Sequence, residues 1–258
     1  MTETQRQELL APMPPQPRSA ITLAGLSKSF GAVTAVDDLS FEVGYGRVVG
    51  FLGPNGAGKT TTLRMLMGLI EPTSGTARIN GVLYGDLDDP VHTLGALLDG
   101  GGLHPGRSGR NHLRIIATAA RIPYSRVEEV LELVDLQSAA DRRAGGYSLG
   151  MKQRLGLAAA LLGDPRILVL DEPANGLDPQ GIHWLRDFLR SLAAEGRAIL
   201  VSSHLLAEVA QTVDDVVVIA GGRLVASGPL ARLLAERGAR TLEEAYLDLT
   251  DAASAGPA

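Results

Sequence analysis

The sequence predicts an α/β fold, with a mainly parallel central sheet and an antiparallel β subdomain near the N-terminus. Beyond residue 148, short buried apolar runs alternate with helical stretches, an order typical of a parallel sheet covered on both faces. Earlier in the chain, residues 21–26 and 39–43 alternate apolar and polar side chains, as strands with one buried face do. Between these two regions, the sequence predicts a helical insertion.

The composition of the chain narrows the classes of protein to which it can belong. Its 258 residues fit one large domain or two modest ones, and a hydrophobic fraction of 45% supplies a substantial core. The net charge of −5 provides no basic field for nucleic acid, and the absence of cysteine excludes disulfides and thiolate metal sites. No apolar run approaches the roughly 18–20 residues of a transmembrane helix. We expect a soluble cytoplasmic protein that reaches a membrane only through a partner.

The N-terminal part of the chain begins with a polar tail, residues 1–19, whose four prolines disfavour folding. The antiparallel subdomain follows, and Asn80-Gly81 predicts a tight hairpin turn after its last strand. The expected strands are 21–26, 39–43, 47–52 and 76–79, and the expected helix is 61–69.

The middle of the chain, residues 88–144, predicts a helical insertion with helices at 111–121, 125–134 and 138–142, punctuated by Pro105 and Pro123. The alternating pattern then supplies strands 167–170, 198–201, 215–219 and 223–226, with helices 155–162, 182–195 and 205–212 between them. We therefore expect one domain over 20–228, which includes the insertion, and a C-terminal extension of two short helices and a tail over 229–258.

A glycine-rich stretch between an apolar strand and a helix is the most informative motif of the chain. It fits the pattern G-x-x-x-x-G-K-[ST] and consists of Gly53, Pro54, Asn55, Gly56, Ala57, Gly58, Lys59 and Thr60. Such a loop turns successive N–H groups into one concavity, to which the following helix adds its positive dipole end. Lys59 can reach the β- and γ-phosphates, and the Thr60 hydroxyl can ligate Mg²⁺. The motif predicts a P-loop NTPase core that binds a nucleoside triphosphate.

Two polar positions at strand ends extend this predicted site. Asp171 and Glu172 follow the buried strand 167–170, where an open α/β sheet places its ligand-binding groups. Asp171 can hold the Mg²⁺ ion, and Glu172 can orient or deprotonate an attacking water. The alternative is that the pair only caps the strand. His204, after strand 198–201, can reach the same crevice, although a lone histidine there is more often a cap or a surface residue.

A second helix start offers another anion site at residues 147–154. Ser148 and Gly150 supply a hydroxyl, free N–H groups and the positive end of a helix dipole. The alternative interpretation is an ordinary N-cap by Ser148. Two phosphate-binding helix starts in one chain suggest that two chains share nucleotides across an interface.

Together these residues resemble the ATP-binding subunits of ABC transporters, and the resemblance covers about residues 21–228. Residues 53–60, with Thr61, match Walker A, and residues 167–172 match Walker B with Glu172 as the catalytic glutamate. His204 matches the switch histidine, and Asp178 lies in the D-loop-like stretch 174–178. Ser148, Leu149, Gly150 and Met151 occupy the signature, and Phe30 stands where the family stacks an aromatic ring on adenine.

The resemblance implies an architecture and a set of partners. Two such domains would pack head to tail when ATP binds, with Ser148 and Gly150 of one chain acting in trans on the other chain's nucleotide. The insertion would form a helical signature subdomain that faces a separately encoded transmembrane permease. The protein would then lie in the cytoplasm, peripheral on the inner face of the cell membrane, with ATP and Mg²⁺ as cofactors.

Three positions depart from the usual family pattern. Leu149 and Met151 replace the usual third and fifth signature residues, so Leu149 must point away from the phosphate. Asp99 stands where many members have the Q-loop glutamine; its carboxylate can still ligate Mg²⁺, although it is shorter and adds negative charge. It is a weaker candidate for a Mg²⁺ ligand because the alignment in this stretch is not fixed to within one or two residues. These departures and the ending 242–250 resemble the drug- and antibiotic-export branch, the ABC-2 type.

The sequence therefore favours an ATPase that powers export of a small drug-like or antibiotic-like molecule. The alternative is a soluble ABC ATPase acting on DNA, ribosomes or cluster assembly. The chain has no long coiled coil, basic stripe or tandem copy, so no nucleic-acid partner is expected. A non-hydrolysing regulatory subunit is opposed by the intact Lys59, Asp171, Glu172 and His204.

Overall fold

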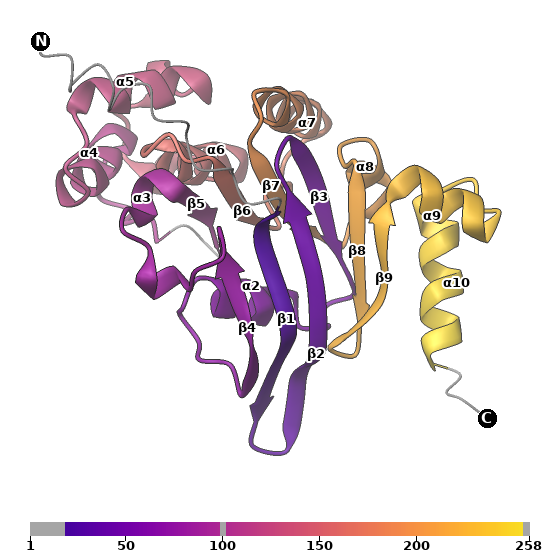
Figure 1. Cartoon of the computed structure of the whole chain (residues 1–258). Coiled ribbons are helices and arrows are strands. Elements are labelled where there is room, and N and C mark those ends of the chain that lie inside the picture. Colours follow the sequence, from indigo (N-terminus) through magenta and orange to yellow (C-terminus); the bar gives the residue numbers. More distant parts are fainter. Residues whose placement is uncertain (1–18, 99–101, 255–258) are drawn as a thin grey trace, which may run out of the picture.

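The computed structural model describes residues 19–98 and 102–254, which form two β-sheets with helices packed around them (Figure 1). The strands are β1 Ser19–Phe30, β2 Val33–Gly44, β3 Arg47–Leu52, β4 Ser74–Ile79, β5 Leu94–Leu97, β6 Ile167–Asp171, β7 Ala198–Ser203, β8 Asp215–Ala220 and β9 Arg223–Pro229. The helices are α2 Lys59–Leu66, α3 Pro90–Thr93, α4 Gly109–Ala119, α5 Tyr124–Leu133, α6 Leu149–Leu161, α7 Pro179–Ala194, α8 Leu206–Ala210, α9 Leu230–Arg237 and α10 Leu242–Ser254. Short 3₁₀ helices are η1 Tyr84–Asp86, η2 Gln137–Ala139 and η3 Ala144–Gly146.

The larger sheet has the strand order β5-β6-β7-β3-β8-β9, and the smaller has the order β2-β1-β4. The pairs β5–β6, β6–β7, β7–β3 and β3–β8 are parallel, whereas β9 runs antiparallel to β8. The smaller sheet is antiparallel throughout. The predicted fold class, a mainly parallel core preceded by an antiparallel β subdomain, is therefore confirmed.

Two hydrophobic cores lie on opposite faces of the larger sheet because side chains alternate along each strand. In β3, Val48 and Leu52 join the core that contains α4 to α7, whereas Val49 and Phe51 join the other. That second core holds α2 and the smaller sheet. In Figure 1, α4, α5 and α6 gather at one end of the larger sheet, and α9 and α10 lie at the other. The chain thus places helical layers at both ends of a parallel sheet.

The beginning of the predicted helical insertion was assigned wrongly. Residues 94–97 form β5, the edge strand that pairs in parallel with β6, and the longer helices begin only at Gly109. The strand is four residues long and contains Gly95, which reads as a chain breaker in sequence. The structure needs this glycine, because a Cβ there would lie 2.0 Å from the carbonyl oxygen of Ala160 in α6. Residues 138–142, predicted as a helix, contain only the end of η2.

Helix α6 begins six residues earlier than the predicted start at residue 155. The apolar run that guided the prediction covers only its C-terminal half, which packs on β5. The first turns carry Lys152, Gln153 and Arg154, which are partly exposed. Ser148 caps the helix by accepting a hydrogen bond from the Met151 amide at 3.2 Å. The signature-like stretch is therefore the first turn of a helix.

The remaining segments follow the sequence closely. Asn80 and Gly81 both have positive φ angles and link Ile79 to Val82, which confirms the tight turn. In the C-terminal extension, α9 and α10 bury Leu233, Leu242 and Leu249 in the main core. Over residues 19–98 and 102–254, no helix is long and apolar enough to cross a membrane.

Candidate active site

The glycine-rich loop runs from the end of β3 into the start of α2, and two of its glycines are required by close backbone contacts. Gly58 has a φ angle of 101°, and a Cβ there would lie 2.4 Å from the carbonyl oxygen of Ala35. A Cβ at Gly53 would lie 2.6 Å from the carbonyl oxygen of Ile219. A side chain at either position would displace the loop from the sheet. The loop conformation therefore depends on glycine at both ends.

Lys59 begins α2, and its side chain folds back over the loop. It is 6% exposed, and its Nζ donates hydrogen bonds to the carbonyl oxygens of Gly53 at 2.6 Å and Pro54 at 3.3 Å. The same Nζ lies 3.5 Å from Glu172 Oε1. The first amides of a helix have no partner within the helix, and no side chain caps the N-terminus of α2 to replace it. An ammonium group and unpaired N–H groups at a helix start make an anion site.

Asp171 ends β6 and is almost fully buried, at 6% exposed. It accepts hydrogen bonds from Thr60 Oγ1 at 2.8 Å and from the hydroxyl of Ser202 in β7. A hydroxyl and a carboxylate are the hard oxygen ligands that Mg²⁺ prefers, so this pair fits the ion. In the described part of the chain, no group of three or more His, Cys, Asp or Glu residues forms a metal cluster. Protein oxygens at Thr60 and Asp171 suit Mg²⁺, which usually keeps several waters.

Glu172 is held at a backbone position that non-glycine residues seldom adopt, with a φ angle of 50°. Its amide donates to the hydroxyl of Ser202 at 2.9 Å and to the carbonyl oxygen of the same residue at 3.2 Å. Its Oε2 lies 2.8 Å from His204 Nδ1. The carboxylate thus stands between Lys59 on one side and His204 on the other. Strained backbone of this kind is concentrated at functional sites.

Lys59, Thr60, Glu172 and His204 open into one hollow, which we call the loop cleft, with a volume of about 370 Å³. Asp171 lies behind Thr60 and does not line it. It is lined by Ala35, Pro54, Asn55, Gly56, Gly58, Lys59, Thr60, Thr61, Glu172, Asn175 and His204. The structure therefore brings together the residues predicted from the glycine motif with those predicted from the ends of β6 and β7. Ala57 is buried beneath the loop.

Phe30 does not line the loop cleft. It is 51% exposed at the end of β1, and Lys28 Nζ lies 5.2 Å from its ring centroid. Ala35, which lines the cleft, belongs to the same β1–β2 hairpin. The hairpin thus brings an exposed aromatic ring to the same part of the molecule. Asp99, the predicted Q-loop residue, lies outside the described residues.

Ser202 and Asn175 are site residues that the sequence did not single out. Ser202 is fully buried and bonds both Asp171 and Glu172. The rule for strand ends that selected Asp171 applies equally to the neighbouring β7, where it would have selected Ser202. Asn175 stood inside the D-loop-like stretch, and only the fold shows that it faces the loop cleft.

The signature-like residues line a different hollow, which we call the α6 depression, with a volume of about 570 Å³. Its lining includes Ser148, Leu149, Gly150, Met151, Gly176, Leu177 and Asp178, and it shares no residue with the loop cleft. Asp178 caps α7 by accepting a hydrogen bond from the Gly181 amide at 2.8 Å. Within one chain, the two predicted phosphate sites are therefore separate.

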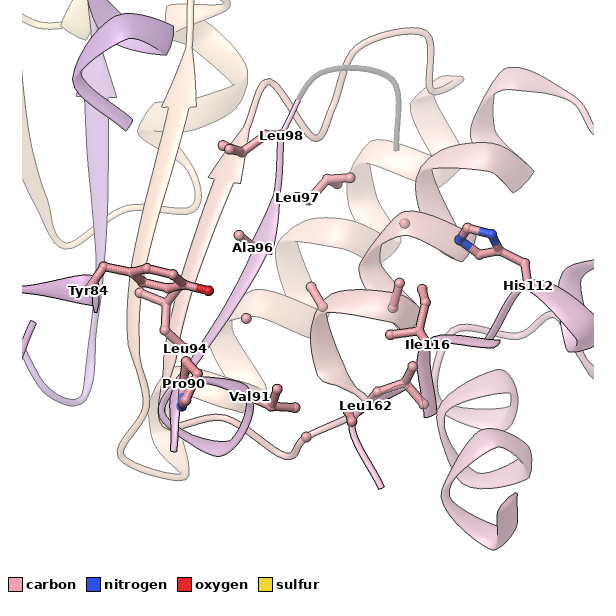
Figure 2. Close-up of a pocket in the computed structure, with 16 residues that line it drawn as sticks. Tyr84, Pro90, Val91, Leu94, Ala96, Leu97, Leu98, His112, Ile116 and Leu162 are labelled. Carbon is pink, nitrogen blue, oxygen red and sulfur yellow. The ribbon is translucent and has the colours of Figure 1, made fainter. Parts of the chain in front are cut away.

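A third hollow, the β5 cleft, lies between the edge strand β5 and helices α4 and α6 and has a volume of about 400 Å³ (Figure 2). Most of its lining is apolar, including Leu94, Leu97 and Ile116. Figure 2 shows His112 and Ile116 across the cleft from the side chains of β5. Burial, together with the charge of Arg107, lowers the pKa of the His112 imidazole.

Comparison with known proteins identifies the family. The pattern described as "ABC transporter" matches residues 36–175, which is more than half of the chain. The chain belongs to the ABC transporter family. A bacitracin transport ATP-binding protein, BcrA of Bacillus licheniformis, is 44% identical over 83% of this chain and 71% of its own. A Nod factor export ATP-binding protein I of Paraburkholderia xenovorans (strain LB400) is 40% identical over 88% and 77%.

A solved structure titled as the ATP binding subunit of an ABC transporter superposes with a TM-score of 0.80. It is 31% identical and covers 90% of this chain and all of its own. The family predicted from the sequence, an ATP-binding ABC subunit of the drug- and antibiotic-export branch, is confirmed. The predicted ATPase activity of the chain is confirmed as well. The loop cleft is thus the candidate ATP site of this ABC ATPase.

Proposed function

We propose that this ABC ATPase powers export of a small drug-like or antibiotic-like molecule through a separately encoded membrane permease. The relatives named for bacitracin transport and Nod factor export support this proposal. The observation that carries it is the convergence of Lys59, Glu172 and His204 in one cleft, at 3.5 Å and 2.8 Å. A regulatory subunit without hydrolytic activity would not need this arrangement. In the cell, the protein would lie peripherally on the inner face of the membrane.

Each charged group of the loop cleft receives a role from its position. Lys59 and the first amides of α2 bind the β- and γ-phosphates, and Phe30 stacks against adenine. The Thr60 hydroxyl and the Asp171 carboxylate would hold Mg²⁺, which when bound would neutralise phosphate charge. Asp99 remains a weaker predicted ligand.

Glu172 accepts a hydrogen bond from the attacking water, because its carboxylate lines the cleft beside the glycine-rich loop. His204 fixes the orientation of that carboxylate through the contact at 2.8 Å. The Ser202 hydroxyl donates to the Asp171 carboxylate and accepts from the Glu172 backbone amide, so it supports both residues. Hydrolysis then requires only positioning and charge stabilisation from this chain, as phosphoryl transfer generally does.

The experiment that tests this assignment is the substitution Glu172→Gln, which keeps the shape of the side chain and removes its basicity. We expect ATP binding to persist, because Lys59 and Thr60 are intact, whereas steady-state hydrolysis falls by a factor of roughly 10² or more. The matched control is Glu208→Gln, on α8 outside the loop cleft. Unchanged hydrolysis by the Glu172→Gln variant would remove Glu172 from the base role.

A complete site is proposed to need two chains, packed head to tail. The separation of the loop cleft from the α6 depression supports this, because Ser148 and Gly150 cannot serve the nucleotide of their own chain. A Lys59→Ala chain and a Ser148→Arg chain should each be inactive, yet a mixture should recover activity. In the mixed dimer, one site combines an intact Lys59 with an intact Ser148. No recovery would contradict the shared site.

The permease is proposed to dock in the β5 cleft, which residues of the predicted insertion and α6 line. The apolar walls suit a short helix of a partner that exposes apolar side chains. Ile116→Arg should abolish recovery of the protein with a membrane subunit, whereas Ile115→Arg on the exposed surface should not. Recovery of the wild-type chain with ribosomes or DNA instead would support the soluble alternative.

A further inference from the structure

Leu149 occupies the third position of the signature, and its side chain lies against Gly176 in the loop after β6. A Cβ at Gly176 would lie 1.9 Å from Leu149 Cδ2 and 2.7 Å from Leu149 Cγ. The leucine thus fills the space that a side chain at position 176 would occupy. Leu149 nevertheless remains 54% exposed. The contact between Leu149 and Gly176 therefore fixes the position of the start of α6 relative to the loop after β6.

Two neighbouring contacts strengthen the same attachment. Leu177 Cδ2 lies 3.3 Å from the position of a Cβ at Gly150, so a larger residue there would press on the Leu177 side chain. Gln153 Nε2 donates a long hydrogen bond to the carbonyl oxygen of Asn175 at 3.5 Å. The first turns of α6 therefore touch the loop at Asn175, Gly176 and Leu177.

The loop that Leu149 touches connects the two hollows. Glu172 and Asn175 line the loop cleft, whereas Gly176 and Asp178 line the α6 depression. The Asn175 amide donates to the carbonyl oxygen of Glu172 at 3.1 Å, which ties the two cleft residues together in one turn. A displacement of Gly176 is therefore passed to the Glu172 backbone through few rotatable bonds.

Gly176 gives this loop backbone freedom unless another residue packs against it. Its φ angle of 73° lies in a region that glycine enters freely and leaves freely. The turn before it contains Glu172, whose own φ angle of 50° is costly. A strained turn next to a free hinge needs a packing contact to keep one conformation. Leu149 supplies that contact.

We propose that Leu149 is a positioning residue that holds the catalytic turn of its own chain. Its side chain, seated on Gly176, keeps Glu172 between Lys59 and His204. The proposal rests on the catalytic role of Glu172 proposed above. It gives the unusual signature leucine a function in the cis cleft, in addition to the trans function proposed for Ser148 and Gly150.

Hydrogen exchange of the nucleotide-free chain tests the contact without reference to catalysis. In Leu149→Ala, amides of residues 174–178 should exchange roughly tenfold faster, the change expected when a half-buried leucine contact is lost. The matched control is Leu247→Ala on α10, since Leu247 is similarly exposed at 60%. Leu149→Met should keep wild-type exchange. Unchanged exchange in Leu149→Ala would overturn the proposal.

A double-substitution cycle tests the same contact through stability. Gly176→Ala suffers the φ strain in any background, but it overlaps Leu149 only when the leucine is present. The substitution should therefore lower the melting temperature more in the wild-type background than in the Leu149→Ala background. Equal decreases in the two backgrounds would show that the side chains do not meet.

The catalytic consequence is measured in mixed dimers, which separate the cis from the trans effect. A Leu149→Ala chain paired with a Glu172→Gln chain leaves one active cleft, in the chain that carries the leucine substitution. A chain with both substitutions paired with wild type leaves the active cleft in the other chain. We expect the larger fall in kcat in the first pair, with the ATP dissociation constant unchanged. A fall confined to the second pair would overturn the proposal.

A wild-type chain that binds ATP without hydrolysing it would instead contradict the proposed function itself, whatever the exchange data show.

Discussion

Replacement of Ser202 by alanine should destabilise the fold and slow hydrolysis together. The hydroxyl is fully buried, donates to the Asp171 carboxylate and accepts from the Glu172 amide at 2.9 Å. Alanine removes both bonds. The Glu172 amide keeps the carbonyl oxygen of residue 202 at 3.2 Å, so most of the cost falls on the buried carboxylate.

The size of the effect follows from the two partners. Loss of one hydrogen bond to a buried charged acceptor costs about 1.5–3 kcal/mol. Thr60 Oγ1 still bonds the other oxygen of Asp171, so we expect the low half of this range, about 2 kcal/mol. For a chain of this length, that corresponds to a fall in melting temperature of roughly 4–8 °C.

Urea unfolding followed by the fluorescence of Trp184 provides the assay. Trp184 is the single tryptophan of the sequence; its ring stacks on Phe188 at 5.2 Å and lies 4.1 Å from Arg154, so unfolding changes its surroundings. Ser191→Ala, at an exposed helix position, is the control. A free energy of unfolding within about 0.5 kcal/mol of wild type for Ser202→Ala would refute the reasoning. Hydrolysis should fall through kcat while the affinity for ATP is kept, because Lys59 and its loop are not touched.

Three further predictions concern other parts of the molecule. Gly58→Ala should abolish ATP binding, because its Cβ would lie 2.4 Å from a backbone oxygen; isothermal titration of ATP would detect any binding that remains. His112→Gln should make the protein less sensitive to acid. The folded-state pKa of His112 is lowered, so the unfolded chain takes up a proton more readily, and the stabilisation present above about pH 6.5 is lost below it. An identical loss of stability between pH 7 and pH 5 in variant and wild type, measured by urea unfolding, would contradict this assignment. Chelation of Mg²⁺ should stop hydrolysis, and excess Mg²⁺ should restore it in wild type but not in Asp171→Ala, as measured by phosphate release.

Much of the loop cleft is predictable from sequence because its chemistry is local. The glycine motif fixes Lys59 and Thr60 within one stretch, and parallel strands bring Asp171 and His204 to the same edge of the sheet. Ser202 lies at a strand end that the same rule selects, but its two bonding partners, Asp171 and the Glu172 amide, come from the neighbouring strand and appear only in the fold. β5 was missed for a related reason. Gly95 looks like a break in sequence, although the sheet needs it to approach α6.

The contact between Leu149 and Gly176 was beyond sequence reasoning. The signature pattern required only that Leu149 point away from a phosphate, and nothing in it identified the glycine on which the leucine lies. The residues are 27 positions apart, and their contact depends on how the start of α6 meets the loop after β6. Tertiary contacts of this kind appear only once the elements are packed.

Glycines at the contacts of α6 with its neighbours have a mechanical consequence. Cβ atoms at Gly95 in β5 and Gly156 in α6 would lie 2.0 Å from the carbonyl oxygen of Ala160 and 2.5 Å from Leu97 Cδ1, so helix and sheet edge are in direct contact. A Cβ at Gly163, just after the helix, would lie 2.1 Å from the carbonyl oxygen of Val91 in α3. Helix α6 spans 13 residues, a rod of about 20 Å, with its rear half clamped to β5 and its front end carrying Ser148. A tilt of α6 imposed at the β5 cleft therefore moves its N-terminal end, which carries Ser148. The contact between helix and sheet transmits such a tilt directly, since the glycines place no compressible side chain between them.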